Sequence, residues 1–500
     1  MQAINKQALR IVKLFGNDDV QTIKTTVGPE QEYFLVDQKY YEQRKDLIYT
    51  GRTLFGAPCP KGQELEDHYF GTIKSRVQEF MSDLNKELWK LGILAKTEHN
   101  EVAPAQHELA PIFTTTNIAT DHNQLTMELI QRVAKKHGLV ALLHEKPFEG
   151  INGSGKHNNF SLSTDTGINL LEPGDTPHEN AQFLVFLAAI IKAVDEHQDL
   201  LRLSVATAGN DHRLGANEAP PAIISIFLGD ELTAVLKAIE EDKPYDGKEK
   251  ELMKIGATVL PKFPKDSTDR NRTSPFAFTG NKFEFRMPGS NSSIAGCNIV
   301  LNTVIADEIE KFAIDAISHG KEAESRGLLN LKTTPDALPY FKTDENIALF
   351  ERQKVLSKEE VESRYEILMD EYEKQINIEA LTMLDIAKKD ILPAASKFSK
   401  ELTDTIANKK AIGIDLTYEL ETAKKVSEYL TEAYQAMMTL ENDVKKLHEI
   451  DDFEKSAFYV RDFIIQDMAS LRKPCDELEV ITSNSDWPFP TYGKLLFGIQ

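Results

Sequence analysis

Hydrophobic residues recur with a helical period in several long segments of this chain. Within 73–91, Val77, Phe80, Leu84 and Leu88 are spaced by three or four residues, which predicts an amphipathic helix. Residues 1–26 show the same spacing at first and then lose it, which predicts a helix followed by a linker. The period predicts a set of further helices, over 118–137, 178–204, 293–318, 357–390, 397–409, 416–447 and 452–471.

Other segments alternate hydrophobic and polar residues, or form short hydrophobic runs, and these features predict strands. The clearest is 281–287, where Lys282, Glu284 and Arg286 alternate with three hydrophobic side chains. Further strands are expected at 33–36, around 101–108, and at 139–145, 157–163 and 220–228. Residues 37–68 and 241–275 are polar and irregular, and we expect loops there.

Together these elements predict an α+β fold. We expect a curved antiparallel sheet or open barrel surrounded by helices, because the polar strand faces and loops come from widely separated segments. Glycine becomes scarce beyond about residue 344, which predicts a helical C-terminal region punctuated by Pro393 and Gly413. The tail beginning at Trp487 is expected to pack back as an anchor. The expected domains are 1–27, 28–343 and 344–500.

Charge and composition narrow the classes of function. Lysine and arginine number 58 against 79 aspartate and glutamate, a net charge of −21. That balance argues against a nucleic-acid partner. The chain has three cysteines, with no zinc-like spacing, which suits a reducing compartment. The longest apolar stretch, 183–194, is too short to span a membrane. We therefore expect a cytoplasmic protein with no membrane partner.

Acidic residues cluster in short motifs that could hold metal ions. Glu30 and Glu32 are two residues apart in a predicted strand, so both carboxylates share one face. Glu101 and Glu108 flank a turn at Pro104. The alternative for each pair is a solvated strand or hairpin, which the neighbouring hydrophobic residues disfavour. Two like charges this close repel each other unless a cation lies between them.

Two further motifs complete a ligand set. His157 follows the glycine-containing turn at 152–155, and Glu284 lies on the charged face of 281–287. A lone histidine is more often structural, and a charged strand face is often solvated. Taken together, the five carboxylates and one imidazole suit a pair of hard divalent cations, Mg²⁺ or Mn²⁺. Such pairs commonly serve phosphoryl chemistry, and the nearby arginines could hold an anionic substrate.

The ordered motifs resemble glutamine synthetase over residues 1–500. They are Gly28-Pro29-Glu30-Gln31-Glu32, residues 101–108, residues 152–157, Asn217-Glu218-Ala219-Pro220, Asn271-Arg272-Thr273-Ser274 and Phe283-Glu284-Phe285-Arg286. The long insertion after Pro221 and the tail Trp487-Pro488-Phe489-Pro490 are similar to the type III branch. The resemblance implies ATP-dependent ligation of ammonia to L-glutamate through γ-glutamyl phosphate. It also implies homo-oligomers, with rings of six that stack into twelve.

The resemblance also implies roles for particular residues. One cation would be held by Glu32, Glu101 and Glu108, and the second by Glu30, His157 and Glu284. Glutamate would be bound by a second set: Asn152, Gly153, Arg213 and Arg286. The nucleotide would be bound by Asn159, Ser161, Arg272 and Lys282, with Arg272 against phosphate. Glu218 would guard the site and help to deprotonate ammonium.

Departures from the family pattern leave alternatives open. Only 27 residues precede Gly28, where the family has a β-grasp domain, so we expect an incomplete ammonia pocket if the chain acts alone. Asn159 stands where a second histidine is common, and Ala277 replaces an arginine. A γ-glutamyl-amine or polyamine ligase is one alternative. A truncated, non-catalytic nucleotide-binding or assembly protein is another.

Overall fold

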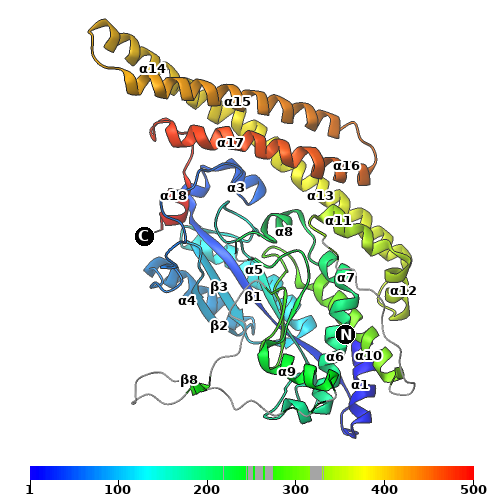
Figure 1. Cartoon of the computed structure of the whole chain (residues 1–500). Coiled ribbons are helices and arrows are strands. Elements are labelled where there is room, and N and C mark those ends of the chain that lie inside the picture. The colour runs from blue at the N-terminus through cyan, green and yellow to red at the C-terminus, as the bar shows by residue number, and fades with distance from the viewer. Residues whose placement is uncertain are drawn as a thin grey trace.

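A computed structural model gives the fold of this chain (Figure 1). The residues described are 1–217, 219–241, 243, 245, 252–253, 263–264, 274–315, 329 and 331–499. Within them the chain forms a mixed α+β fold, as the sequence predicts. A sheet lies beside helices of the N-terminal half, and long helices of the C-terminal region lie across one end of it (Figure 1).

The sheet is open, and its strand order is β2-β3-β1-β6-β11-β10-β7, with β4 and β5 also paired to β1. The strands are β1 Ile23–Asp37, β2 Ala95–Asn100, β3 Gln106–Pro111, β4 Thr114–Thr115, β5 Leu139–Leu142, β6 Lys156–Thr164, β7 Ile226–Phe227, β10 Phe276–Phe278 and β11 Phe283–Phe285. All pairs in it are antiparallel except β10 with β7, which is parallel and therefore departs from the predicted antiparallel sheet. A separate two-stranded pair joins β8 Leu252–Met253 and β9 Phe263–Pro264.

Strand β1 organises this sheet because it pairs with four others along its length. Its side chains alternate between two hydrophobic clusters. Tyr33 and Leu35 pack with α4 Ser75–Lys90 and α5 Thr116–Lys136, and Phe34 and Val36 pack on the opposite side. Burial on both faces explains why residues 33–36 of this strand form a continuous hydrophobic run.

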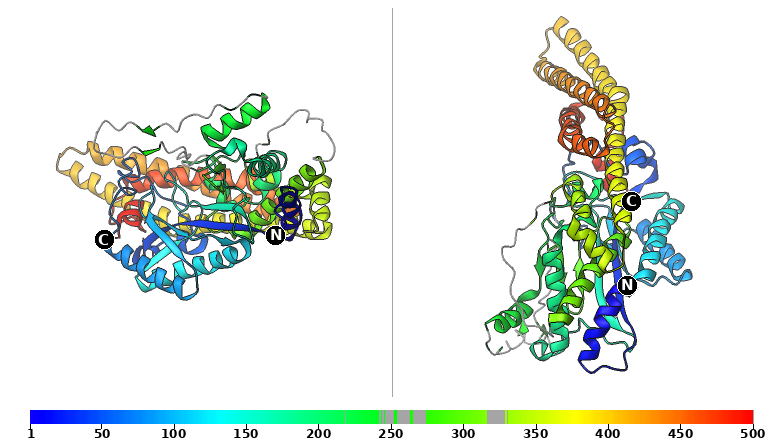
Figure 2. Two further views of the ribbon diagram at one scale, coloured as in Figure 1. Left: turned by 90° about the horizontal axis from the view of Figure 1, so that it is seen from below. Right: turned by 90° about the vertical axis from the view of Figure 1, so that its right-hand side faces the viewer.

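Helices cover the remaining sheet surface. α1 Gln2–Leu14 packs against α10 Ile294–Asp315, and α10 also packs against α6 Ala181–Glu196. These helices share the largest hydrophobic cluster with β6, β10 and β11. In the right-hand view of Figure 2 the blue α4 and the cyan α5 lie on one side of the sheet, and the green helices lie on the other. The shorter helices are α2 Gln38–Tyr41, α3 Lys45–Thr50, α7 Gln198–Leu203, α8 Ala208–Arg213 and α9 Gly229–Glu240.

The C-terminal region is helical from α11 onward. Its elements are α11 Thr334–Ala337, α12 Asp344–Arg352, α13 Lys358–Ile386, α14 Leu392–Ala411, α15 Thr417–Leu447, α16 Phe453–Tyr459, α17 Ile465–Ile481 and α18 Tyr492–Phe497. α14 and α15 form a hairpin that projects from the rest of the chain (Figure 1). α15 also packs along α17.

The last residues of the chain pack back onto the N-terminal half. Trp487 is 8% exposed, and the Arg44 guanidinium lies 4.4 Å from the Phe489 ring centroid. The Tyr492 hydroxyl lies 2.6 Å from the Thr53 hydroxyl and accepts a hydrogen bond from Arg472. The tail thus connects the C-terminal helices to the loop that follows α3.

Several local predictions are wrong in informative ways. Residues 37–68 contain α2 and α3, since Asp37 caps the first of these with a hydrogen bond from the Lys39 amide. β1 begins at Ile23, inside the expected linker. The expected strand 220–228 is reduced to 226–227, and helix 178–204 is interrupted at His197. Pro393 does not break its helix, because a π-helical segment at 387–391 precedes it.

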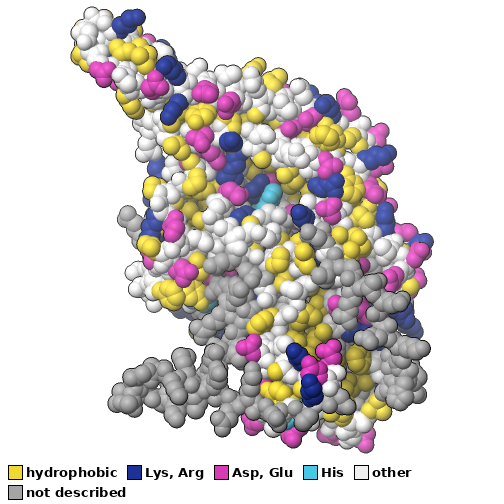
Figure 3. Space-filling model, in the orientation of Figure 1, with side chains coloured by type: hydrophobic (Ala, Val, Ile, Leu, Met, Phe, Trp, Pro, Cys, Tyr) yellow, Lys and Arg dark blue, Asp and Glu magenta, His cyan; other side chains and the backbone are white. Residues whose placement is uncertain are grey.

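The surface seen in Figure 3 mixes acidic, basic and hydrophobic side chains over the C-terminal helices. No helix among the residues described combines the length and hydropathy of a membrane span.

Candidate functional site

The central strands bring the first acidic motif next to the histidine motif. β1 and β6 pair so that Glu30 lies opposite His157. The His157 Nδ1 lies 2.9 Å from a Glu30 carboxylate oxygen, and Asn159 Nδ2 donates to the other at 3.0 Å. Burial alone would raise the pKa of Glu30 and lower the pKa of His157. Their contact has the opposite effect and prevails, so the pKa of Glu30 is lowered to about 2 and the pKa of His157 is raised to about 9.

The second acidic motif joins the site through β3. β1 and β3 pair Glu32 with Glu108, and Glu101 lies directly after β2 instead of within a strand. All three carboxylates are buried, with exposed fractions of 7%, 7% and 2% respectively. Burial and neighbouring carboxylates raise the pKa of Glu32, and they raise the pKa of Glu108 to about 7. The sheet therefore concentrates negative charge that a cation would compensate.

The structure groups the metal-ligand atoms around Glu108. Atoms of Glu30, Glu108 and His157 lie within 4.8 Å of one another, and so do atoms of His99, Glu101 and Glu108. This grouping differs from the two predicted trios, because Glu108 belongs to both sets. The carboxylate-rich chemistry and the short separations fit hard divalent ions.

His99 is a site residue that the sequence analysis missed. Its Nε2 lies 2.9 Å from Glu108 Oε1, and its Nδ1 lies 3.5 Å from Glu101. The hydrogen bond to Glu108 raises the pKa of His99 to about 9. A signal was present, because His99 stands two residues before Glu101 and an extended chain repeats its faces every two residues.

Glu284 lies on the neighbouring strand β11, between two cationic side chains of the same strand region. It accepts hydrogen bonds from Lys282 at 3.3 Å and from Arg286 Nε at 3.0 Å. Lys282 also donates to the Asn159 side-chain oxygen. Burial alone would raise the pKa of Glu284, but the neighbouring charges of His157 and Lys282 lower it. Glu284 thus lies beside the Glu30–His157 pair with its carboxylate already bonded to cationic side chains.

A small cavity collects most of the predicted substrate residues. Asn152, Gly153 and Arg213 line it together with Glu32, Glu101, His157 and Pro220. Gln63 fixes Asn152 by two hydrogen bonds of 2.8 Å, one to the side chain and one from the backbone amide. The cavity therefore brings the glycine motif next to the carboxylates.

The glycines of this motif allow Arg213 to approach the backbone. A Cβ at position 155 would lie 2.2 Å from Arg213 Nη2, and one at position 153 would lie 2.3 Å from the Glu145 carbonyl oxygen. Arg213 donates to the carbonyl oxygens of Met287 and Arg286, each at 3.1 Å. The glycines are thus required by close packing rather than by turn conformation.

A turn at 287–292, buried as far as Ser290, contacts residues of the site. Lys156 donates to the carbonyl oxygens of Gly289, Ser290 and Ser292, and Glu145 accepts from the Asn291 amide at 3.1 Å. Ser290 donates to the Glu32 carbonyl oxygen at 2.6 Å. No role could be predicted for Lys156 or Glu145 from the sequence, because neither falls in a pattern that indicates buried polar contacts.

The other predicted site residues are placed as follows. Ser161 lies on β6 on the same face as Asn159, and its hydroxyl contacts Asn169 at 2.7 Å. Arg286 is buried and paired with Glu284. Glu218 and Arg272 lie outside the described residues.

Comparisons with known proteins give this site a family. The profile described as "Glutamine synthetase, catalytic domain" matches residues 7–225, and "Glutamine synthetase C-terminal domain" matches residues 317–410. The glutamine synthetase of Butyrivibrio fibrisolvens is 48% identical, covering 100% of this chain and 76% of that protein. The type-3 glutamine synthetase of Dictyostelium discoideum is 43% identical, covering 99% and 73%.

A third relative, the glutamine synthetase of Bacteroides fragilis, is 40% identical over 99% of this chain and 74% of its own length. Such matches and the carboxylate-lined site together define an enzyme of the ligase class. The chain belongs to the glutamine synthetase family, which confirms the resemblance read from its motifs.

Proposed function

We propose that this chain joins ammonia to L-glutamate with ATP to give L-glutamine, through a γ-glutamyl phosphate intermediate. The observation that carries the proposal is the meeting of Glu30, Glu108 and His157 in a chain whose full length matches glutamine synthetases. The fold positions these groups by pairing β1 with both β3 and β6.

The divalent ions of the family fit the residues present. Glu32, Glu101 and Glu108 would hold one Mg²⁺ or Mn²⁺, and Glu30, His157 and Glu284 would hold the second. Glu108 lies near enough to His157 to be shared between the two positions. When bound, such ions neutralise phosphate oxygens and stabilise the charge that develops during phosphoryl transfer. His99 orients Glu108 through its 2.9 Å contact.

Glutamate is held by the cavity at the glycine motif. Asn152 and Gly153 bind its α-substituents, and Arg213 and Arg286 act on its carboxylates. The support for this is that Arg213 lines the cavity while its guanidinium is fixed by backbone carbonyl oxygens. A fixed cation reduces the repulsion between the γ-carboxylate and the phosphate that it attacks.

ATP is bound by residues of β6 and its neighbours: Asn159, Ser161, Lys282 and Arg272. A γ-carboxylate oxygen of glutamate forms a bond to the γ-phosphorus while the bond from that phosphorus to ADP breaks. Ammonia then attacks the acyl carbon and phosphate leaves. Glu218 accepts the proton that ammonium releases, and Arg272 acts on the phosphate.

Further properties follow from the family. We propose a cytoplasmic homo-oligomer built from hexameric rings, which stack in pairs as a dodecamer, with Mg²⁺ or Mn²⁺ at two or more positions per chain. Its substrates are the small molecules glutamate, ammonia and ATP. Nucleic acids are not expected as partners, given the net charge of −21. A membrane is not expected as a partner because the longest apolar stretch, 183–194, is too short to span one.

Phosphate release with ATP, Mg²⁺, glutamate and ammonium tests the proposal. We expect release to require all four components and to match the amount of glutamine formed, and we expect little release with putrescine or ethanolamine. Faster turnover with either amine would favour the γ-glutamyl-amine ligase. ATP binding by calorimetry without turnover in the full-length protein would favour the non-catalytic alternative.

A further inference from the structure

Lys146 is a buried lysine that the proposed mechanism does not use. It follows β5, it is 2% exposed, and burial lowers the pKa of its ammonium group to about 8. The ammonium group donates to the Ile151 carbonyl oxygen and, at 2.7 Å, to the Asn217 side-chain oxygen. Both acceptors are uncharged, so these bonds offset only part of the cost of burying the charge. We call the two hydrogen bonds the Lys146 bridge, because they connect segments that are far apart in the sequence.

The bridge ends beside two walls of the catalytic cavity. Ile151 immediately precedes residues 152–153, which line the cavity, and Asn217 shortly precedes residues 219–220, which line it as well. Lys146 does not line the cavity itself. It therefore acts on the cavity through the two walls and not through contact with a substrate.

The loop at 214–220 is shaped by bonds of its own. The Gly215 amide donates to the Pro220 carbonyl oxygen at 2.9 Å, which closes the loop. Asn217 has a φ of +51°, a left-handed conformation that asparagine and glycine adopt more readily than other residues. These features fix the shape of the loop but not its distance from the turn at 152–155. The Lys146 bridge supplies that connection.

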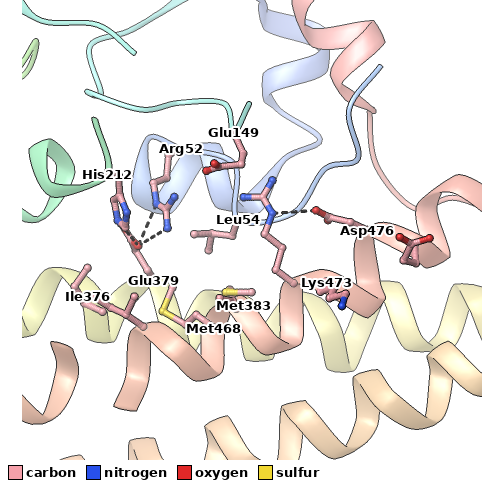
Figure 4. A pocket seen from close by; sticks show the side chains of 14 residues that line it. Arg52, Leu54, Glu149, His212, Ile376, Glu379, Met383, Met468, Lys473 and Asp476 are labelled. Carbon is pink, nitrogen blue, oxygen red and sulfur yellow. Dashed lines mark hydrogen bonds and ion pairs between the residues drawn. The ribbon is translucent and has the colours of Figure 1, made fainter. Parts of the chain in front are cut away.

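A second cavity, of about 500 Å³, lies between these segments and the C-terminal helices. Glu149, two residues before Ile151, and His212, at the end of α8, line it together with residues of α13 and α17. Figure 4 shows Glu149 and His212 above the long helices. Packing against α13 and α17 is interrupted by this cavity, so it restrains the two segments less than a filled interior would. Hydrogen bonds such as those of the bridge then decide their separation.

We propose that Lys146 is a positioning residue for the ligation, holding the turn at 152–155 and the loop at 214–220 at the separation that the catalytic cavity requires. The inference rests on the proposed function, in which Glu218, the residue after Asn217, accepts the proton of ammonium. When the bridge is lost, the walls separate and water reaches γ-glutamyl phosphate. Water then attacks the acyl carbon in place of ammonia, phosphate leaves, and glutamate and a proton are released, so ATP is consumed without forming glutamine.

The ratio of phosphate released to glutamine formed tests this role, because a general loss of structure lowers both products together. We expect a ratio of about one in the wild type. Lys146→Met removes the charge and the donors and should raise the ratio to about two or more and the KM for ammonium about 10-fold. Lys146→Arg keeps the charge and the donors and should restore most of the coupling. Lys86→Met, at an exposed lysine of α4, is the control and should leave the ratio unchanged. A wild-type ratio in Lys146→Met would overturn the proposal.

Asn217→Gly tests the bridge from its other end without a buried substitution. Asn217 is exposed, and glycine retains its left-handed backbone while removing the side-chain acceptor. We expect the ratio to rise as in Lys146→Met, and the double variant should exceed the larger single effect by less than about twofold. Fully additive effects would show that the two residues act separately and would contradict the bridge.

Amide hydrogen exchange gives a readout that does not depend on activity. Asn217→Gly should speed exchange across residues 152–155, and Lys146→Met should speed exchange of the Gly215 amide, each by about 10-fold. Unchanged exchange in both segments would overturn the bridge, whether or not the protein is active. Faster exchange in a chain whose wild type forms no glutamine would support the bridge and contradict the proposed function instead.

Discussion

His99 Nε2 lies 2.9 Å from Glu108 Oε1, on the strand that pairs directly with the strand of Glu108. The contact fixes the orientation of the one carboxylate that belongs to both groups of potential metal ligands. Histidine–carboxylate pairs beside metal sites commonly tune ion affinity by restricting the ligand's orientation.

Removing the His99 imidazole should therefore weaken metal binding. We expect His99→Ala to raise the Mg²⁺ concentration for half-maximal phosphate release about 10-fold or more. His99→Gln keeps a donor toward Glu108 and should raise it less. A metal titration of both variants measures the effect, and an unchanged Mg²⁺ requirement in His99→Ala would show that Glu108 needs no such support.

The glycine at 155 should be intolerant of substitution. A Cβ there would lie 2.2 Å from Arg213 Nη2, so Gly155→Ala must displace the guanidinium. We expect kcat/KM for glutamate to fall about 100-fold. Gly296→Ala is the matched control, because its Cβ would meet nothing closer than 3.8 Å on the exposed side of α10. A Gly155→Ala enzyme with wild-type kinetics would exclude Arg213 from substrate binding.

The C-terminal tail should contribute to global stability through the Tyr492 hydroxyl. That oxygen contacts the Thr53 hydroxyl at 2.6 Å and the Arg472 guanidinium at 3.0 Å. The Glu149 amide also donates to it at 3.3 Å, so Tyr492→Phe leaves three partners without this oxygen and should lower the free energy of unfolding by about 1–3 kcal/mol. Tyr434→Phe, at a side chain 55% exposed, should change it little. Denaturant titration compares the two variants, and equal effects would show that the tail contact is weak.

Glu479 should make stability depend on pH. Burial raises its pKa to about 7 in the folded chain, from an ordinary value of 4.5. The folded state then holds a proton that the unfolded state has lost, so stability declines as pH rises from 4.5 through 7. Between pH 4.5 and pH 8, the free energy of unfolding of Glu479→Gln should rise relative to that of the wild type by up to about 3 kcal/mol. Unfolding curves of both proteins at both pH values provide the check. If the difference between their free energies of unfolding is the same at pH 4.5 and pH 8, the pKa of Glu479 is not raised in the folded chain.

Much of the fold could be read from periodicity. The alternation at 281–287 predicts β11 with its charged face, although β11 itself is confined to 283–285, and the helical spacing at 73–91 predicts α4. Short elements were missed, because the helices within 37–68 depend on a capping side chain and on contacts with the tail. Pro393 was predicted to separate two helices. It is instead accommodated near the start of α14, because the π-helical segment at 387–391 changes the hydrogen-bond pattern where the proline has no amide to donate.

The residues of the candidate site likewise divide into those that a periodic pattern predicts and those that depend on tertiary contacts. Strand periodicity predicts that Lys282 and Glu284 share a face, and the two side chains form a hydrogen bond. The grouping of Glu30 with His157 is implied by the family resemblance and not by periodicity, and the pairing of β1 with β6 places the two opposite each other. Residues held by tertiary contacts alone could not be found. Glu145 and Lys156 interact with the turn at 287–292, which is distant in sequence and carries no pattern of its own.

The number of Mn²⁺ ions bound to the purified protein, counted by electron paramagnetic resonance, is the decisive measurement for the metal site. We expect two ions per chain in the wild type. Glu108→Gln should weaken both sites, since Glu108 belongs to both clusters, whereas Glu98→Gln on β2 should weaken neither. Two ions bound with unchanged affinity in Glu108→Gln, or no specific Mn²⁺ binding to the wild type, would contradict it.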